Sequence, residues 1–107
     1  MRSGRGVLLA RLGRREPALA DARASLRLDH QPEVTYQVAG IYALTSREHP
    51  ADRAEAFRLL RIAFEQGFGL ELVDQDPELG PIRSLAEFRE IVQSAKARRL
   101  DDLRQMK

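Results

Sequence analysis

Two apolar, periodic runs between Pro32 and Gly67 constrain the fold of this chain more than any other feature. The first run places apolar residues at spacings that suit a helix buried on more than one side, and the second carries a single stripe with a period of 3.6 residues. A polar break at 46–50 separates them and contains Pro50. Two helices joined by a short break form a helical hairpin. One hairpin cannot bury both faces of its helices, so we expect a neighbouring unit.

The same pattern recurs earlier in the chain, because Gly6 and Gly40 are 34 residues apart. The upstream copy has an apolar run at 7–12 and a turn at 13–16. Pro17 is then expected at the first position of the second helix, where its missing N–H does no harm. The inner stripe of that helix is predicted to contain Ala18, Leu19, Ala22 and Leu26. The chain therefore predicts two consecutive helical hairpins.

The residues at equivalent positions resemble the tetratricopeptide (TPR) repeat, whose period is also 34 residues. The positions that carry the resemblance are Gly6, Ala18, Tyr36, Gly40, Ala56, Leu60 and Ala63. The resemblance implies an all-α fold, with two TPR-like hairpins in a short right-handed solenoid and a C-terminal capping helix. A glycine inside a helix costs up to about 1 kcal/mol relative to alanine, so Gly40 needs a packing reason. Close approach of two helices in a pair, at Gly40 and Ala63, is the expected one.

The length of 107 residues fits a single domain. We expect repeat one at about residues 3–32, repeat two at about 33–67 and a capping segment at about 68–107. Gly67 is a candidate helix C-cap, and the Ser84–Glu87 pair reads as a capping box that opens the last helix. The order of an Asp-Pro pair, a second turn and a Phe-containing helix is similar to the segment that closes TPR arrays in bacterial proteins such as TPR-bearing serine/threonine kinases. The chain has no kinase motif.

Composition and charge bound the function classes. Apolar residues make up 43% and charged residues 32%, and there is no cysteine, which excludes disulfides and thiolate zinc sites. No apolar run approaches the roughly 18 residues of a membrane span, and a cytoplasmic setting is the default expectation. The net charge is +2, but residues 1–32 hold seven arginines. An alternative function is therefore nucleic-acid or acidic-surface binding through this Arg-rich N-terminal repeat, although few aromatics accompany the arginines for stacking on single strands.

No residue pattern in the chain indicates catalysis, a metal or a cofactor. Asp74, Asp76 and Glu78 alternate like the start of an EF-hand, but Leu79 stands where that loop requires glycine. We therefore predict a helix cap at Asp76. His30 and His49 fall in separate turns and are predicted at the surface. No serine has a histidine spaced as its base, so we expect no catalytic residue and a non-enzymatic protein.

The TPR resemblance implies that the first helices of successive units line a concave groove. The 34-residue register brings Ser3 beside Gln37, Val7 beside Ile41, and Arg11 beside Thr45. The groove of Val7, Arg11, Gln37, Ile41 and Thr45 suits an extended or helical peptide. This favours a protein–protein interaction module within a larger regulatory protein. Two alternatives stay open: that these residues only pack against the closing helix at 84–95, and that Tyr36 and Tyr42 serve either the core or the groove.

The N-terminal hairpin is predicted to have a short first helix that leaves apolar residues uncovered. Exposed apolar patches on small domains mark interfaces. We therefore expect a concentration-dependent homodimer through residues 7–26, by a two-fold contact or an exchange of helices.

Overall fold

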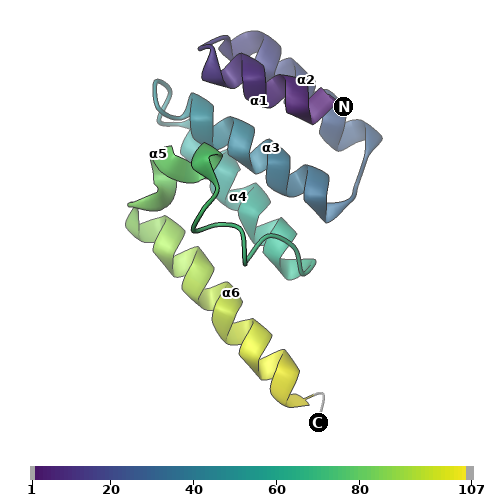
Figure 1. Ribbon diagram of the computed structural model, residues 1–107, viewed down its shortest axis with the longest axis vertical. Helices are drawn as coiled ribbons and strands as arrows, with labels where there is room; N and C mark the ends of the chain where they lie inside the picture. The colour runs from purple at the N-terminus through teal and green to yellow at the C-terminus, as the bar shows by residue number, and fades with distance from the viewer. Residues whose placement is uncertain (1, 106–107) are drawn as a thin grey trace.

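The computed structural model describes residues 2–105, with side chains from residue 4 onward, and within this range the backbone forms helices and turns but no strand. The elements in chain order are α1 (Arg2–Arg11), α2 (Arg15–Leu28), α3 (Pro32–Thr45), α4 (Asp52–Glu65), the 3₁₀ turn η1 (Pro77–Leu79), α5 (Gly80–Arg83) and α6 (Ala86–Gln105). Figure 1 shows α1 to α4 stacked side by side, with α6 running away from the stack. The all-α prediction is confirmed for the described part of the chain.

Helix α3 lies at the centre of the packing. It contacts α1, α2 and α4 as well as η1 and α5. Nine of its fourteen residues are buried, and these are Thr35, Tyr36, Val38, Ala39, Gly40, Ile41, Tyr42, Ala43 and Thr45. The predicted burial on more than one side is therefore confirmed. Each large apolar side chain such as Ile41 contributes about 1.5–3 kcal/mol by leaving water.

Helices α2 and α4 each bury one face, as their apolar stripes predicted. Ala18, Ala56 and Ala63 have no exposed area. On α2, Leu19 is buried as well, whereas Leu26 is only partly buried. Alanine at these positions adds no bulk beyond Cβ, so the helices can approach closely while leaving no void.

A glycine follows the end of α1 and another follows the end of α4, in the turns where the chain changes direction. Gly13 and Gly67 have φ angles of 76° and 86°, the left-handed conformation that glycine adopts without strain. At Gly67 its own N–H donates to Phe64 O at 2.9 Å, and the next N–H, of Phe68, donates to Ala63 O at 3.0 Å. This is the Schellman pattern, and it confirms the predicted C-cap at Gly67.

The start of α2 differs from the prediction. The helix begins at Arg15, so Pro17 is its third residue and not its first. The main-chain N–H groups of the first helical turn have no partner within the helix, and proline is accommodated there for the same reason as at the first position.

The expected role of Gly40 is wrong. A Cβ at Gly40 would lie 3.1 Å from the Cβ of Glu78, so this glycine faces η1 rather than the other helix of its hairpin. Close helix–helix approach occurs at Gly6 instead, where a Cβ would lie 2.7 Å from Ile41 Cδ1 and 3.4 Å from the carbonyl oxygen of Ala18. Each of the two equivalent glycines therefore faces the element that follows its own hairpin.

The segment between α4 and α6 is held by buried side chains and by one arginine. Val73, Leu79 and Ile82 are buried to 1% exposure or less. Arg83 donates to the carbonyl oxygens of Val73, at 2.9 Å, and of Asp76. The carboxylate of Asp76 accepts from the main-chain N–H of Glu78 at 3.2 Å, which confirms the predicted helix cap.

The last helix starts later than its predicted capping box. Helix α6 begins at Ala86, two residues after Ser84, and the Glu87 carboxylate pairs with Arg61 at 3.2 Å. Its first half buries Phe88, Ile91, Val92 and Ala95, and α6 packs on α4 and α5. From residue 96 to 105 every residue is exposed. The predicted capping segment extends to residue 107, and residues 106–107 lie outside the described range.

A polar clamp joins the two hairpins at one end. Arg15, at the start of α2, makes two parallel hydrogen bonds of 2.9 Å to Asp52, at the start of α4. Thr45 Oγ1 donates to the same carboxylate at 2.7 Å. The hydrogen bonds from Arg15 hold the pKa of Asp52 below its usual value. Bidentate arginine–carboxylate pairs fix orientation as well as adding energy, so the clamp sets how the hairpins meet.

Replacing Asp52 by Asn should lower the free energy of unfolding at pH 7 by about 1–2 kcal/mol, less than for a fully buried pair because solvent screens the Arg15 end. A depressed folded-state pKa gives stability that is present above the unfolded pKa of about 3.9 and is lost as pH falls through the folded pKa. Urea unfolding from pH 7 to pH 3 should therefore show the difference between the two proteins shrinking. The exposed Asp102→Asn should track the parent, and a constant D52N deficit at every pH would contradict the account.

Candidate functional site

A cavity of about 240 Å³ opens where α1, α3 and the segment after α4 meet. In Figure 1 these three parts lie on the near side, with the green connecting segment in front of the helices. The cavity is lined by Val7, Glu33, Tyr36, Gln37, Gly40, Phe68, Leu72, Asp76 and Glu78. Val7 from the first hairpin and Gln37 from the second, both predicted as groove residues, are brought together here.

The other predicted groove residues lie elsewhere. Ile41 has no exposed area, and Thr45 is buried and hydrogen-bonded within the clamp. Both placements correct the expected groove, since neither side chain offers a surface to a ligand. Arg11 is exposed at the edge of the cavity, where it pairs with Glu78 at 2.8 Å. The side chain of Ser3, expected beside Gln37, lies outside the described ones.

The groove is bounded by the segment before α5, not by the closing helix. Glu78 of η1 contacts α3 at Gly40 and α1 at Arg11. The alternative from the sequence placed the closing helix at 84–95 against the groove residues, whereas the neighbour found there is Glu78 of η1. The structure leaves a hollow between α1, α3 and the segment that contains η1.

Tyr36 belongs to the core and to the cavity at once. Its ring meets Phe68 edge to face with centroids 5.6 Å apart, and a Cβ at Gly69 would lie 2.6 Å from the same ring. The residue is 6% exposed, and its buried hydroxyl group lies beside the carboxylate of Asp76. Burial, followed by the nearby carboxylate of Asp76, raises the pKa of the hydroxyl, so it stays protonated.

Three carboxylates line the same cavity. Burial, and then the neighbouring Glu78 carboxylate, raise the pKa of Asp76. The pKa of Glu78 is lowered, first by hydrogen bonding with Asp76 and then by Arg11. The third carboxylate, Glu33, is exposed at the first turn of α3. The cavity therefore combines apolar walls with an acidic rim.

The N-terminal arginines of the alternative function are partly engaged with carboxylates. Arg5 pairs with Asp21 at 3.2 Å, Arg11 pairs with Glu78, and Arg15 pairs with Asp52. These contacts orient the guanidinium groups toward the protein's own acidic side chains. They reduce the positive charge that the first hairpin presents to an acidic partner.

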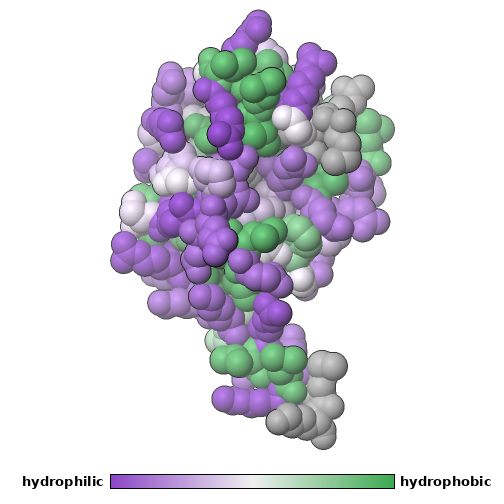
Figure 2. All heavy atoms as spheres, viewed as in Figure 1, coloured by the Kyte–Doolittle hydropathy of each residue, from purple (hydrophilic) through white to green (hydrophobic). Residues whose placement is uncertain are grey.

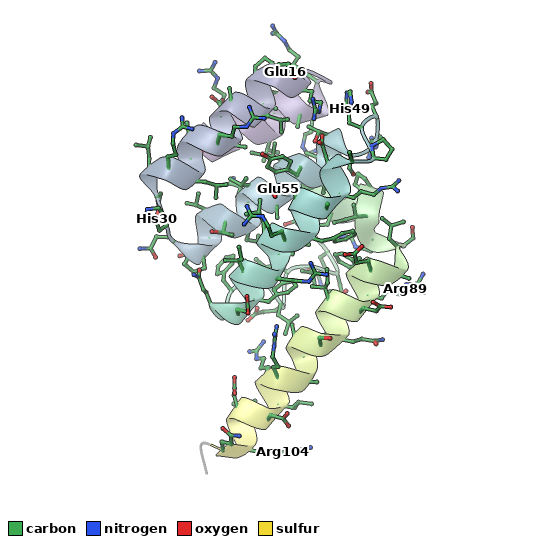
Figure 3. All side chains as sticks on the ribbon, turned by 180° about the vertical axis from the view of Figure 1, so that it is seen from behind. Glu16, His30, His49, Glu55, Arg89 and Arg104 are labelled. Carbon is green, nitrogen blue, oxygen red and sulfur yellow. The ribbon has the colours of Figure 1, made fainter. Side chains whose placement is uncertain are left out.

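The two histidines lie at opposite ends of the hairpins, His30 in the connection before α3 and His49 in the turn before α4 (Figure 3). Both are exposed, as predicted. Among residues 2–105 no group of three or more His, Asp or Glu side chains is placed to hold a metal ion. No helix in that range has the length and apolar content of a membrane span.

The sequence missed most of the cavity lining. The sequence pattern indicated Asp76 and Glu78 only as cap or metal ligands. Their alternation on one short segment was the available signal. It does not indicate which helix the segment crosses, and the contact with α3 was therefore not predictable.

Replacing Gly69 by Ala should destabilise the fold by about 2–4 kcal/mol, because the new methyl group overlaps the Tyr36 ring and the φ of +101° strains any L-residue. The control is Gly4→Ala in α1, where a Cβ meets no atom within 4 Å. Helix propensity should make that variant more stable by about 0.5–1 kcal/mol. Thermal unfolding of both variants measures the difference, and equal midpoints would contradict the described packing at Gly69.

Comparisons of the chain with protein-family models, curated proteins and solved structures give no match.

Proposed function

We propose that this chain is a TPR-like helical solenoid domain that binds a segment of a partner polypeptide in the groove between α1 and α3. The domain is a non-enzymatic interaction module within a larger regulatory protein. The observation that carries the proposal is the cavity at that junction, because it brings Val7 of one hairpin beside Gln37 of the next. Ligand sites commonly occupy concave places between helices.

The repeat geometry supports the TPR-like part of the proposal. Gly6 and Gly40 stand 34 residues apart, and each faces the element that follows its own hairpin. Helix α3 packs on α1 as η1 and α5 pack on α3. A solenoid is built by such repeated contacts between each unit and the next.

The charge arrangement favours a polypeptide partner over nucleic acid. Three of the N-terminal arginines face carboxylates of the same chain. The cavity itself is lined by Glu33, Asp76 and Glu78, whose charges repel phosphates. Phosphate contacts require unopposed basic groups and produce a steep salt dependence.

Display selection of random peptides against the full chain tests the function. Selected peptides should shift the amide resonances of Val7 and Gln37, and Gln37→Ala should weaken their affinity about three- to tenfold through lost polar contact. Thr45→Ala is the matched control, because Thr45 is buried in the clamp and should cost stability but not affinity in the folded protein. Failure to select any peptide, or peptides that contact only the α2 and α4 faces, would contradict the proposal.

The predicted homodimer through residues 7–26 is a second, separate proposal. Within that range Leu8 on α1 and Leu12, which follows the last residue of α1, are 58% and 65% exposed, and the main-chain N–H of Leu12 donates to Leu8 O at 3.1 Å. Figure 2 shows an apolar area over α1, among polar side chains. A two-fold contact would set this face of α1 against its own copy.

Sedimentation equilibrium over a hundredfold concentration range should show monomer–dimer exchange. Leu8→Glu should shift the protein to monomer, because it introduces a charge into an apolar contact. The control is Leu103→Glu, since Leu103 is similarly exposed at 53% but lies on α6. A monomer at every concentration, or equal effects of the two variants, would argue against this interface.

A further inference from the structure

Another cavity, of about 400 Å³, lies where the start of α4 meets the start of α6. Figure 3 labels His49 and Arg89, which mark the turn before α4 and the first half of α6. The volume falls within the roughly 300–1,000 Å³ of sites for small molecules. The walls are largely apolar and include Pro50, Ala54, Phe57 and Leu85, and the charged residues among the lining are Arg53 and Glu87.

Arg53 brings an unpaired guanidinium group to this cavity. The residue is partly buried, and its Nε is buried but forms no hydrogen bond. Among the described side chains, no carboxylate pairs with Arg53 and no aromatic ring stacks on it. Buried polar groups are normally satisfied, so a buried guanidinium N–H without an acceptor at the wall of a cavity calls for an explanation.

The acidic side chains nearest to Arg53 in the chain are engaged by other groups. Asp52 is held in the clamp, and Glu55 accepts hydrogen bonds of 2.8 and 2.6 Å from Arg58. Arg53 also lies in the first turn of α4, where the helix dipole disfavours a cation. Its position therefore does not stabilise α4, and no carboxylate of the protein balances its charge.

The second charged residue of the lining limits the charge of a ligand. Glu87 is exposed and pairs with Arg61 at 3.2 Å, so it is not a partner of Arg53. A dianionic phosphate would meet one unpaired guanidinium and would be repelled by this carboxylate. A carboxylate carries a single charge, and its two oxygens match the planar fork of an arginine.

We propose that this cavity, the Arg53 cavity, binds a carboxylate group that is carried on a short apolar body. The guanidinium of Arg53 donates hydrogen bonds to the carboxylate oxygens, and the apolar body packs against Phe57 and Leu85. The carboxylate can belong to a free organic acid or to the C-terminus of a polypeptide, since the recognised chemistry is the same. The inference does not depend on the proposed function, because the Arg53 cavity shares no lining residue with the cavity between α1 and α3.

Benzoate and benzamide test the proposal, because they have nearly the same shape and differ in charge. Each is titrated into the ¹⁵N-labelled full chain. Benzoate should give saturable shifts at the main-chain amides of Ala51, Arg53, Ala54 and Leu85. It should bind at least about tenfold more tightly than benzamide, because hydrogen bonds to an ionised acceptor are stronger than neutral ones. Equal binding of benzamide would overturn the proposal, as would no saturable shift at tens of millimolar benzoate.

Matched arginine variants locate the charged contact. Arg53→Gln should weaken benzoate at least about tenfold and leave the thermal midpoint unchanged or higher, since Arg53 pairs with no carboxylate and opposes the helix dipole. The control is Arg27→Gln, which removes the same charge from an exposed position on α2 and should leave affinity unchanged. Equal weakening by R27Q would mean that general electrostatic attraction accounts for the binding. A lower midpoint for R53Q with unchanged affinity would assign Arg53 a structural role, and either result would overturn the proposal.

Smaller anions test the apolar wall. Acetate keeps the carboxylate but lacks the ring, so it should bind about tenfold more weakly than benzoate because it buries less apolar surface. Inorganic phosphate should bind more weakly than benzoate as well. Acetate or phosphate that saturates the same resonances as tightly as benzoate would indicate a general anion site and would overturn the assignment.

A pair of dipeptides distinguishes the two sources of the carboxylate. Acetyl-Ala-Leu with a free C-terminal carboxylate is compared with the same dipeptide as its amide. Tighter binding of the free acid form than of benzoate would assign the cavity to a polypeptide C-terminus, and the reverse order would assign it to a free organic acid. Both orders support the proposal, whereas equal binding of the amide and the free acid form, at the affinity of benzoate or tighter, would overturn the role of the carboxylate.

Discussion

The structure depends on one helix, α3, that has apolar residues on more than one side. Helix α3 has too little polar surface to lie at the edge of a domain, so each of its faces must be covered. Helices α1, α2 and α4 cover part of it, and η1 with α5 covers the remainder. The irregular segment at 68–85 is thus part of the core, although it contains little regular structure. Val73 and Ile82, both without exposed area, anchor it there.

The covering of α3 by η1 and α5 also places residues of the candidate site. Because Gly40 lacks a side chain, Glu78 can approach α3, and Asp76 follows it toward Tyr36. The carboxylate of Asp76, which caps η1, and that of Glu78 therefore lie at the rim of a cavity whose walls come largely from the hairpins.

Polar contacts fix the relative placement of the hairpins more narrowly than apolar burial does. Apolar packing is non-directional, whereas the bidentate pair of Arg15 and Asp52 defines both a distance and a plane. The clamp lies at one end of α3, and the contact of Arg11 with Glu78 ties α1 to η1. Arg11 and Arg15 are two of the seven arginines in residues 1–32, so part of the basic charge of the first hairpin is paired within the chain.

The sequence alone determined the helices and their pairing, because periodic apolar spacing is a local property. It placed Ala18, Ala56 and Ala63 in the core, and it assigned Val7 and Gln37 to one groove, where both line the cavity. Only the tertiary structure decided that Ile41 and Thr45 are buried, since the register gives the order of residues along a helix but not how far a neighbour covers them. It also decided the acidic and aromatic lining from 68–78. That segment has no period to read, and its path is set by the surface of α3 that remained to be covered.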